Sequence, residues 1–431
     1  VVAKFFLPVF INNDILTLPQ FMQRRYDRRL KTILALFWVA LFVFVNLTSI
    51  LYLGALTLKT VFGIKLIYAI SGLAIFTLVY SITNGLKAIA SADIIQVFFL
   101  VAGGILTTIF ALDAVSDQGG MIAGFNRIVN DFPEKLRMII SKDDPNYLYL
   151  PGIRAIFGGI WIAGIYYFGA NQYIIQKALG SKSLREAQKG MIFAGFLKLL
   201  MPLIVVLPGI AAHAMNADIT KPDEAYPWLL SNLIPSGIRG LIFAALIAAI
   251  ISSLSAIVNS TATIFTMDIL KELRQKALSE NQLVFTGRIS GIIAMAVAAL
   301  IAPLLGELDQ AFQFIQEFTG MISPGITAIL VLGMFWKGTT SNSAIAGLIL
   351  SLILSIVLKF TITEVAFLDK MLLSFLITTV FIVIYAVIEG NGSGKEQVLV
   401  FNRKMFRTDT LFNVYSIIII LILTVLYLAF W

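Results

Sequence analysis

The chain of 431 residues contains no cysteine and only one histidine. Without cysteine it can form no disulfide framework, no thiol nucleophile and no Cys-rich metal site. The single histidine, His213, excludes a multi-His metal cluster, and its apolar surroundings in GIAAHAM predict an interfacial or packed residue. A Ser/His/Asp set, a His–Glu metal motif and a P-loop are also missing from the sequence. An enzyme is therefore the least favoured class.

Charged residues are scarce as well, at 13% of the chain, whereas 59% of the residues are hydrophobic. Ordinary soluble domains carry about 25% charged residues. The composition therefore predicts an all-α polytopic membrane protein, a bundle of spanning helices to which the size of a soluble domain does not apply.

Apolar runs long enough to cross a hydrocarbon core, about 20 residues, occur at about eleven places. Residues 1–11 read as the end of one more span, because VVAKFFLPVF has neither the basic n-region nor the A-x-A site of a signal peptide. We therefore expect an N-terminal portion to be missing; an initiator Met directly before Val1 in the gene would refute this. The predicted spans lie near residues 32–57, 65–84, 91–115, 154–178, 190–215, 240–265, 285–306, 310–336, 343–361, 367–389 and 412–431.

Basic residues concentrate in alternate loops, and this asymmetry predicts the orientation, since short cytoplasmic loops carry excess Lys and Arg. It places the C-terminus outside an inner (plasma) membrane. The net charge of +8 is then a topology signal; the basic runs are too short to indicate nucleic-acid binding. The basic loops hold Arg24, Arg25, Arg28, Arg29 and Lys31; Lys177, Lys182, Arg185 and Lys189; Lys271, Arg274 and Lys276; and Lys395, Arg403, Lys404 and Arg407.

The stretch 240–270 carries a seam of small and hydroxyl residues within an apolar run. Ala245, Ala249, Ser252 and Ala256 share one helical face, and Ser253 lies beside it. Uncharged hydroxyls are hard oxygen donors of the kind that Na⁺ accepts. The alternative is that these residues only help helices to pack and bond their own carbonyls.

Three polar side chains fall inside predicted spans, where they are costly and hence candidates for function. Asn46, in the middle of FVFVNLTSI, needs hydrogen-bond partners, either on another helix or on a polar ligand. Asp93, near a cytoplasmic end, is either a capping residue or an attractor of cations on an exit path. Lys198 either extends back to the interface or faces inward as a donor to a polar solute.

Two predicted spans contain residues that interrupt helices. GIYYFGANQYIIQ combines Gly164 and Gly169 with amides and tyrosines, and AFQFIQEFTGMISPGITA combines Gln316 with the pair Pro324 and Gly325. Transporters use broken helices to line a site at the membrane midplane, although a proline kink against a neighbouring helix is the commoner outcome for one such motif.

At this level of detail the chain resembles the sodium/solute symporter family, and within it the bacterial sodium/galactose branch. The resemblance implies a LeuT-type inverted-repeat helix bundle that is N-terminally incomplete, with residues 1–431 as one transmembrane transporter domain. Residues 1–11 would be the end of the second core helix, 32–336 the third to tenth core helices, and 343–431 three C-terminal flanking helices. It rests on ILTLPQFMQRRYDRRLKTILALFW, FVNLTSILYLG, SADIIQVFFLVAGG, YYFGANQYIIQKALGSKSLREAQKGMIFAGFLKL, AALIAAIISSLSAIVNSTATIFTMDI and AFQFIQEFTGMISPGI.

The resemblance also implies roles for individual residues. A sodium site would use the Ala249 carbonyl and the Ser252 and Ser253 hydroxyls, with Asp93 on the cytoplasmic route of the ion. The sugar site would use the remaining polar residues, and two phenylalanines would form the outer gate. These are Asn46, Lys198, Gln316 and Tyr167 for the sugar, Tyr167 also closing its cytoplasmic side, and Phe42 with Phe312 for the gate.

The sequence departs from the family pattern at several points. Gly164 stands where the galactose branch has a sugar-binding asparagine, and Phe42 where the family has a tyrosine. The first core helix and most of the second are absent, and with them the carbonyls that would complete the sodium site. We therefore expect no coupled transport from the chain as given.

The sequence thus predicts a secondary active transporter that couples inward Na⁺ movement to uptake of a galactose- or glucose-like sugar by alternating access. The alternatives are a Na⁺-coupled symporter of another solute, such as a polyol, amino acid or carboxylate, and a Na⁺-independent channel or sensor on the same fold. Sodium, the sugar and membrane lipid are the expected partners; the sequence makes no prediction of oligomeric state.

Overall fold

The computed structural model describes residues 1–83, 86–144, 147–148, 152–273, 279–308, 310–390 and 402–431, and every regular element in these residues is a helix. Among these residues, nine helices are long and apolar enough to cross a membrane. They coincide with nine of the predicted spans, because runs of apolar residues this long have no other way to satisfy their backbone groups in lipid. The predicted segments 1–11, 65–84 and 154–178 correspond to shorter apolar helices, Val2–Asn12, Leu66–Ser81 and Ile160–Ala170.

The chain divides into two compact units. The first comprises 1–36, 138–196 and 316–431, and the second comprises 37–137 and 197–315. Helices α4, α12 and α18 each contribute residues to both. Of the predicted basic-loop residues, Arg274, Lys276 and Lys395 lie outside the described residues.

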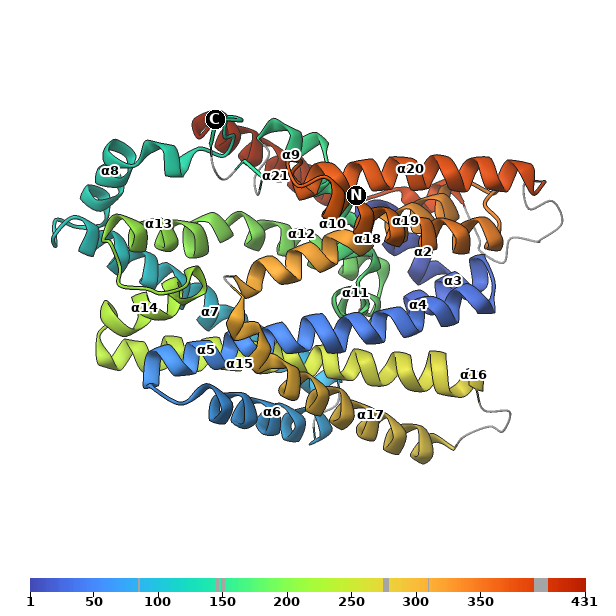
Figure 1. Cartoon of the computed structure of the whole chain (residues 1–431), viewed down its shortest axis with the longest axis horizontal. Helices are drawn as coiled ribbons and strands as arrows, with labels where there is room; N and C mark the ends of the chain where they lie inside the picture. The colour runs from blue at the N-terminus through green and yellow to red at the C-terminus, as the bar shows by residue number, and fades with distance from the viewer. Residues whose placement is uncertain (84–85, 145–146, 149–151, 274–278, 309, 391–401) are drawn as a thin grey trace. The chain divides into compact units, whose positions relative to one another are not determined.

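The first unit contains the N-terminal helices and the C-terminal ones. Helices α19 and α20 lie side by side in it (Figure 1). Its elements are α1 (Val2–Phe5), α2 (Leu7–Asn12), α3 (Leu18–Arg25), most of α4 (Arg28–Leu41), α9 (Ile153–Phe157), α10 (Ile160–Ile165), η3 (Tyr166–Ala170), α11 (Gln172–Leu179), most of α12 (Leu184–Leu199), most of α18 (Ala311–Phe335), α19 (Ser341–Thr361), α20 (Phe367–Ile388), η8 (Arg403–Phe406) and α21 (Thr410–Ala429).

The second unit is organised around α15, which packs against α5, α6, α7 and α17 (Figure 1). Small residues allow this close packing; a Cβ on Gly103 of α7 would lie 3.0 Å from the side chain of Ile242. Its elements are the end of α4, η1 (Phe42–Leu47), α5 (Thr48–Phe62), α6 (Leu66–Thr83), α7 (Leu86–Val115), α8 (Met121–Asp131), η2 (Pro133–Leu136), η4 (Pro202–Val206), α13 (Leu207–Ala214), η5 (Pro222–Glu224), α14 (Ala225–Asn232), α15 (Ser236–Ile264), η6 (Phe265–Leu270), α16 (Lys271–Leu273), α17 (Glu280–Ile301) and η7 (Ala302–Glu307).

The two predicted spans that contain helix-interrupting residues, 154–178 and 310–336, differ in structure. The span at 154–178 is divided into α9, α10, the π-helical η3 and α11, whereas α18 continues through Pro324 as one helix. Proline cannot donate to the carbonyl four residues before it. In α18 that carbonyl belongs to Gly320, and the Ser323 hydroxyl donates to it at 3.4 Å. The neighbouring hydroxyl is thus a long hydrogen-bond donor to the carbonyl that proline leaves without its usual partner.

Candidate functional site: oxygen ligands and amides within the membrane helices

Asn46 and Phe42 lie in one wide turn of a continuous membrane helix. The helix Arg28–Phe62 changes to π-helical geometry at Phe42–Leu47 and returns to α-helix at Thr48. The Thr48 hydroxyl donates to the carbonyl of Val43, five residues earlier, at 2.8 Å. Such π-helical turns occur frequently at functional sites. This one re-aims the two side chains that the sequence predicted for the sugar site and the gate.

The Asn46 side chain is 5% exposed, and its Oδ1 has no hydrogen-bond partner among the described residues. Leaving a buried amide oxygen unpaired costs about 1–3 kcal/mol. A ligand hydroxyl that donated to Asn46 Oδ1 would recover that free energy. The buried amide oxygen of Asn46 is therefore suited to accept a hydrogen bond from a solute.

The predicted sodium ligands lie on α15, beside α7. Ser252 is buried, Ala249 is half-buried and Ser253 is exposed. The Ser252 hydroxyl donates a close hydrogen bond to Oδ1 of Asp93 on α7. The sequence placed Asp93 only on an exit route, and the structure places its carboxylate directly against a predicted ligand.

This arrangement has a clear electrostatic consequence. Asp93 is half-buried within an apolar helix pair, where a charge is less screened than in water. The carboxylate of Asp93 and the hydroxyl of Ser252 are hard-oxygen groups of the kind that a small cation prefers. Among the described residues there is no group of three or more His, Cys, Asp or Glu side chains that could hold a metal ion.

Lys198 is exposed near the end of α12, four residues before Pro202. The helix loosens there: the Leu200 carbonyl accepts hydrogen bonds from both Leu203 and Ile204, at 3.0 Å each, and π-helix Pro202–Val206 follows. Lys198 thus stands just before a local distortion caused by proline.

Phe312 is the second residue of α18, and the start of this helix contacts the segment at η5 (Pro222–Glu224). The backbone N–H of Ala311 donates to Asp223 Oδ2 at 2.7 Å, and Lys221 Nζ donates to the Leu308 carbonyl at 2.7 Å. Burial raises the pKa of Asp223, while the N–H groups of Ala311 and Phe312 and the charge of Lys221 oppose that rise. The predicted gate residue Phe312 is 57% exposed, whereas Phe42 is fully buried.

Tyr167 lies in the π-helical segment of the divided span. Its ring makes an edge-to-face contact with Phe168, at 5.1 Å between centroids, and is 37% exposed. The break is anchored by Gln172, which accepts from the N–H of Leu18 at 3.0 Å and donates to the carbonyl of Leu16 at 3.2 Å. The amide thus links the start of α11 to the backbone that leads into α3.

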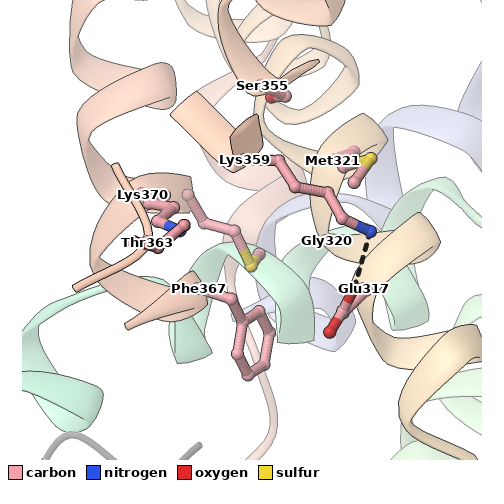
Figure 2. Close-up of a pocket in the computed structure, with 9 residues that line it drawn as sticks. Glu317, Gly320, Met321, Ser355, Lys359, Thr363, Phe367 and Lys370 are labelled. Carbon is pink, nitrogen blue, oxygen red and sulfur yellow. Dashed lines mark hydrogen bonds and ion pairs between the residues drawn. The ribbon is translucent and has the colours of Figure 1, made fainter. Parts of the chain in front are cut away.

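Gln316 is exposed on the first turns of α18, and its neighbour Glu317 lines a cavity of about 220 Å³. Figure 2 shows the Lys359 ammonium of α19 directed at the Glu317 carboxylate, 2.8 Å away, with Phe367 and Lys370 of α20 at the same cavity. The ion pair ties the segment that carries Gln316 to the next helix.

The structure therefore brings together Ser252 with Asp93, and Phe42 with Asn46. Tyr167 and Gln316 belong to the first compact unit, whereas Asn46 and Lys198 belong to the second. The grouping of these four residues into one sugar site remains a prediction.

Sequence reasoning missed one structural device, at the end of α18 opposite Gln316. Arg25 donates to the carbonyls of Gly333, at 2.7 Å, and Trp336, at 3.0 Å, and so satisfies the free carbonyls at the end of α18. The sequence signal was present, since Arg25 lies in a basic loop, but it indicated orientation and gave no partner.

Comparisons with known proteins bear on the family and the fold. The model of the Sodium:solute symporter family matches residues 1–351. A sodium/glucose cotransporter from Vibrio parahaemolyticus is 46% identical, over 100% of this chain and 82% of the relative. The human sodium/myo-inositol cotransporter 2 is 30% identical, over 82% of this chain and 56% of the relative. The uncharacterized symporter YidK of Escherichia coli K12 is 34% identical, over 78% and 59%.

A solved structure of a Na⁺-coupled sialic acid symporter, in a substrate-bound outward-open state, matches with a TM-score of 0.77 and 24% identity. The match covers 90% of this chain and 80% of that one. This likeness shows the fold, which is LeuT-like as predicted. A family model over most of the chain shows a carrier rather than an enzyme in a multi-pass membrane protein. The chain belongs to the Sodium:solute symporter family.

Proposed function

We propose that the protein is a secondary active transporter that couples inward Na⁺ movement to uptake of a neutral, glucose- or galactose-like sugar. The observation that carries the proposal is the Ser252–Asp93 contact inside the membrane helices of a sodium:solute symporter. The relative that is a sodium/glucose cotransporter, with 46% identity over the whole chain, supports the sugar as the solute.

For the ion, the proposed ligands are the Ala249 carbonyl and the hydroxyls of Ser252 and Ser253. Buried Ser252 and exposed Ser253 are consecutive on α15, so an ion between them would touch both a protected and an accessible oxygen. Asp93 would compete with the ion for Ser252 and then draw it toward the cytoplasm.

For the sugar, the proposed contacts are Asn46, Lys198, Gln316 and Tyr167, with Phe42 and Phe312 as the outer gate. The unpaired Oδ1 of Asn46 supports an accepting role toward a sugar hydroxyl. Amides and an ammonium together suit a ligand with several hydroxyls, each of which both donates and accepts.

Coupling requires that Na⁺ bind the outward-facing state better than the inward-facing state. In this mechanism the ion holds α15 in the state whose sugar site faces outward, and loss of the ion to Asp93 releases the sugar inward as Tyr167 moves. A membrane potential adds about 2.3 kcal/mol per charge per 100 mV. The proposal places the protein in the plasma membrane with its C-terminus outside and treats residues 1–431 as one transport domain containing the third to tenth core helices.

A second candidate is Na⁺-coupled transport of another polyhydroxylated solute. It is favoured by Gly164, where a built Cβ has no atom within 4 Å, so the position that holds an asparagine in the galactose branch is open here. The myo-inositol cotransporter among the relatives makes a polyol the leading alternative.

The test is counterflow of labelled glucose in proteoliposomes that contain the native protein, with and without Na⁺ and with a panel of competing solutes. Stimulation by Na⁺ and competition by glucose or galactose support the proposal. Na⁺-independent flux would instead indicate a channel or sensor, and competition by a polyol alone would indicate the second candidate. Ser253→Ala should weaken the Na⁺ dependence; an unchanged Na⁺ affinity would contradict the role of that hydroxyl.

A further inference from the structure

A crevice lies between the start of α12 and the start of the C-terminal helix α21, with a volume of about 450 Å³. Its walls are mostly apolar and aromatic. Ile192, Phe193 and Phe196 come from α12, and Phe412 and Tyr415 come from α21. Phe196 and Tyr415 meet edge to face at 6.0 Å between ring centroids, and they form the base of a hollow lined by rings. None of the residues predicted for the sodium or sugar site lines it.

Two basic side chains, Arg185 and Lys189, stand at the mouth of the crevice, and each is paired with a carboxylate. Arg185 Nε donates to Asp409 Oδ2 at 3.1 Å, and Lys189 Nζ donates to Glu186 at 2.9 Å, yet both basic side chains are more than half exposed. Within the described part of the chain, the two terminal guanidinium nitrogens of Arg185 have no hydrogen-bond partner, so they remain available to an oxyanion. Asp409 also accepts from the N–H of Phe412 at 2.8 Å, which divides its charge between two donors.

The mouth lies at the N-terminal ends of two helices that are long and apolar enough to span a membrane. Arg185 stands in the first turn of α12 and Asp409 caps α21, whereas the rings of Phe193, Phe196 and Tyr415 lie farther along the same helices. Helix α21 has 20 residues, and none of its most apolar window is buried against the rest of the described protein. Lys182, Lys404 and Arg407 add further positive charge in the adjoining segments.

We propose that this crevice binds one anionic phospholipid, whose phosphate contacts Arg185 and Lys189 and whose acyl chain lies against Ile192, Phe193 and Phe196. Basic pockets between membrane helices recognise anionic headgroups by this combination of charge and apolar depth. A free phosphate would use only the charged mouth, and a zwitterionic lipid would use mainly the apolar walls. The proposal does not depend on which solute the protein transports.

The test is native mass spectrometry of the detergent-solubilised protein, titrated with phosphatidylglycerol or phosphatidylcholine of the same acyl chains. We expect phosphatidylglycerol to bind preferentially, and Arg185→Gln with Lys189→Gln to lower its affinity about 30-fold, from the contribution of two basic groups near an anionic lipid. Ile192→Trp fills the hollow but keeps both charges, and it should also lower the affinity. The matched control is Lys59→Gln with Lys65→Gln. It removes two exposed positive charges that do not line the crevice, and it should leave the phosphatidylglycerol affinity unchanged.

Several results would overturn the proposal. They are equal binding of the two lipids, unchanged phosphatidylglycerol affinity in the Ile192→Trp variant, an equal loss in the Lys59/Lys65 control, and displacement of bound lipid by millimolar inorganic phosphate alone. If the Arg185/Lys189 variant does not fold, the Ile192→Trp variant still decides between lipid and free phosphate, because only a lipid needs the apolar hollow.

Discussion

Gly54 on α5 is the point at which the packing around the proposed sodium ligands can be disturbed most cleanly. A Cβ added there would lie 2.8 Å from Cγ2 of Ile250, the residue that follows Ala249 on α15, and 3.1 Å from Leu73 Cδ1. Ordinary contacts between carbon atoms are about 3.5–4.0 Å. Ile250 Cγ2 is bonded directly to Cβ, and a β-branched side chain in a helix has one strongly preferred χ1 rotamer, so it has no easy way to move aside.

Gly54→Ala therefore pushes α15 away at the level of the sodium ligands. Overpacking costs about 1–3 kcal/mol, while alanine in place of a helical glycine returns about 1 kcal/mol. The net effect on thermal stability should be small, but the displacement of α15 remains. A loss of 1 kcal/mol in the Na⁺-bound state corresponds to about a fivefold change in affinity. We expect the Na⁺ concentration for half-maximal sugar uptake to rise about fivefold or more.

The assay is Na⁺-dependent sugar uptake in proteoliposomes, with Gly72→Ala as the matched control. Gly72 also lies inside a helix, and a Cβ there has no atom within 4 Å, so the control keeps the change in helix propensity without the clash. Ile250→Ala removes the obstructing methyl, so adding Gly54→Ala to that variant should cost no further Na⁺ affinity. A Gly54→Ala variant that behaves like Gly72→Ala, or no rescue by Ile250→Ala, would refute the reasoning.

Four further changes test separate parts of the account. Ser252→Ala removes a proposed ligand oxygen of the ion, and the half-saturating Na⁺ concentration in uptake should rise about tenfold, the factor that corresponds to about 1.4 kcal/mol of lost binding free energy; an unchanged value would remove Ser252 from the ion site. Gly164→Asn should fit into open space and improve competition by galactose several-fold, and a variant with no gain would show that the position does not face the sugar. Lys359 and Glu317 are about one third exposed, so a double-mutant cycle on thermal unfolding should give a coupling of only about 0.2–1 kcal/mol; several kcal/mol would mean a fully desolvated pair. The pKa of Asp223 is raised in the folded protein, so the stability that protonated Asp223 contributes is present below the ordinary pKa of 3.8 and is lost as pH rises through the folded-state pKa. Thermal stability should therefore fall across that pH window in the wild type and change less in Asp223→Asn. Parallel pH profiles of the two proteins would contradict the shift.

The spanning helices were predictable because hydrophobicity over about 20 residues is a local property. The runs at 240–265 and 285–306 both became helices, extended at their ends to Ser236–Leu270 and Glu280–Glu307. The extensions mix polar residues with apolar ones, so hydropathy gives only a weak signal for where the helices end.

Helix geometry within the spans was harder to predict. The sequence indicated breaks at both the Gly-rich 164–172 segment and Pro324, but only the first span is divided. Both motifs are compatible with either outcome, and the side chains beside them find different partners: Gln172 bonds to Leu16 and Leu18, and the Ser323 hydroxyl donates to the Gly320 carbonyl. A motif does not specify such partners by itself.

The candidate site was predicted residue by residue, but its contacts were not. Ser252 and Asp93 are separated by 159 positions in the chain, and neither span contains a signal for the other. The π-helical turn that holds Phe42 and Asn46 likewise has no propensity signature, because its widened hydrogen bonds are stabilised by packing around the turn. Polar residues within apolar spans and the family resemblance identified the candidate residues, and tertiary packing decides what they face.

The central claim is that ion and sugar movements are coupled through α15. Coupling of this kind is reciprocal, so a sugar gradient must drive Na⁺ just as a Na⁺ gradient drives sugar, and this tests the claim most directly. Proteoliposomes of the native protein are given an inward sugar gradient and no Na⁺ gradient, and the influx of radiolabelled Na⁺ is followed. The account predicts that glucose drives Na⁺ inward, that a non-transported solute does not, and that Ser253→Ala weakens the effect. Sugar influx that leaves the rate of Na⁺ entry unchanged would contradict it.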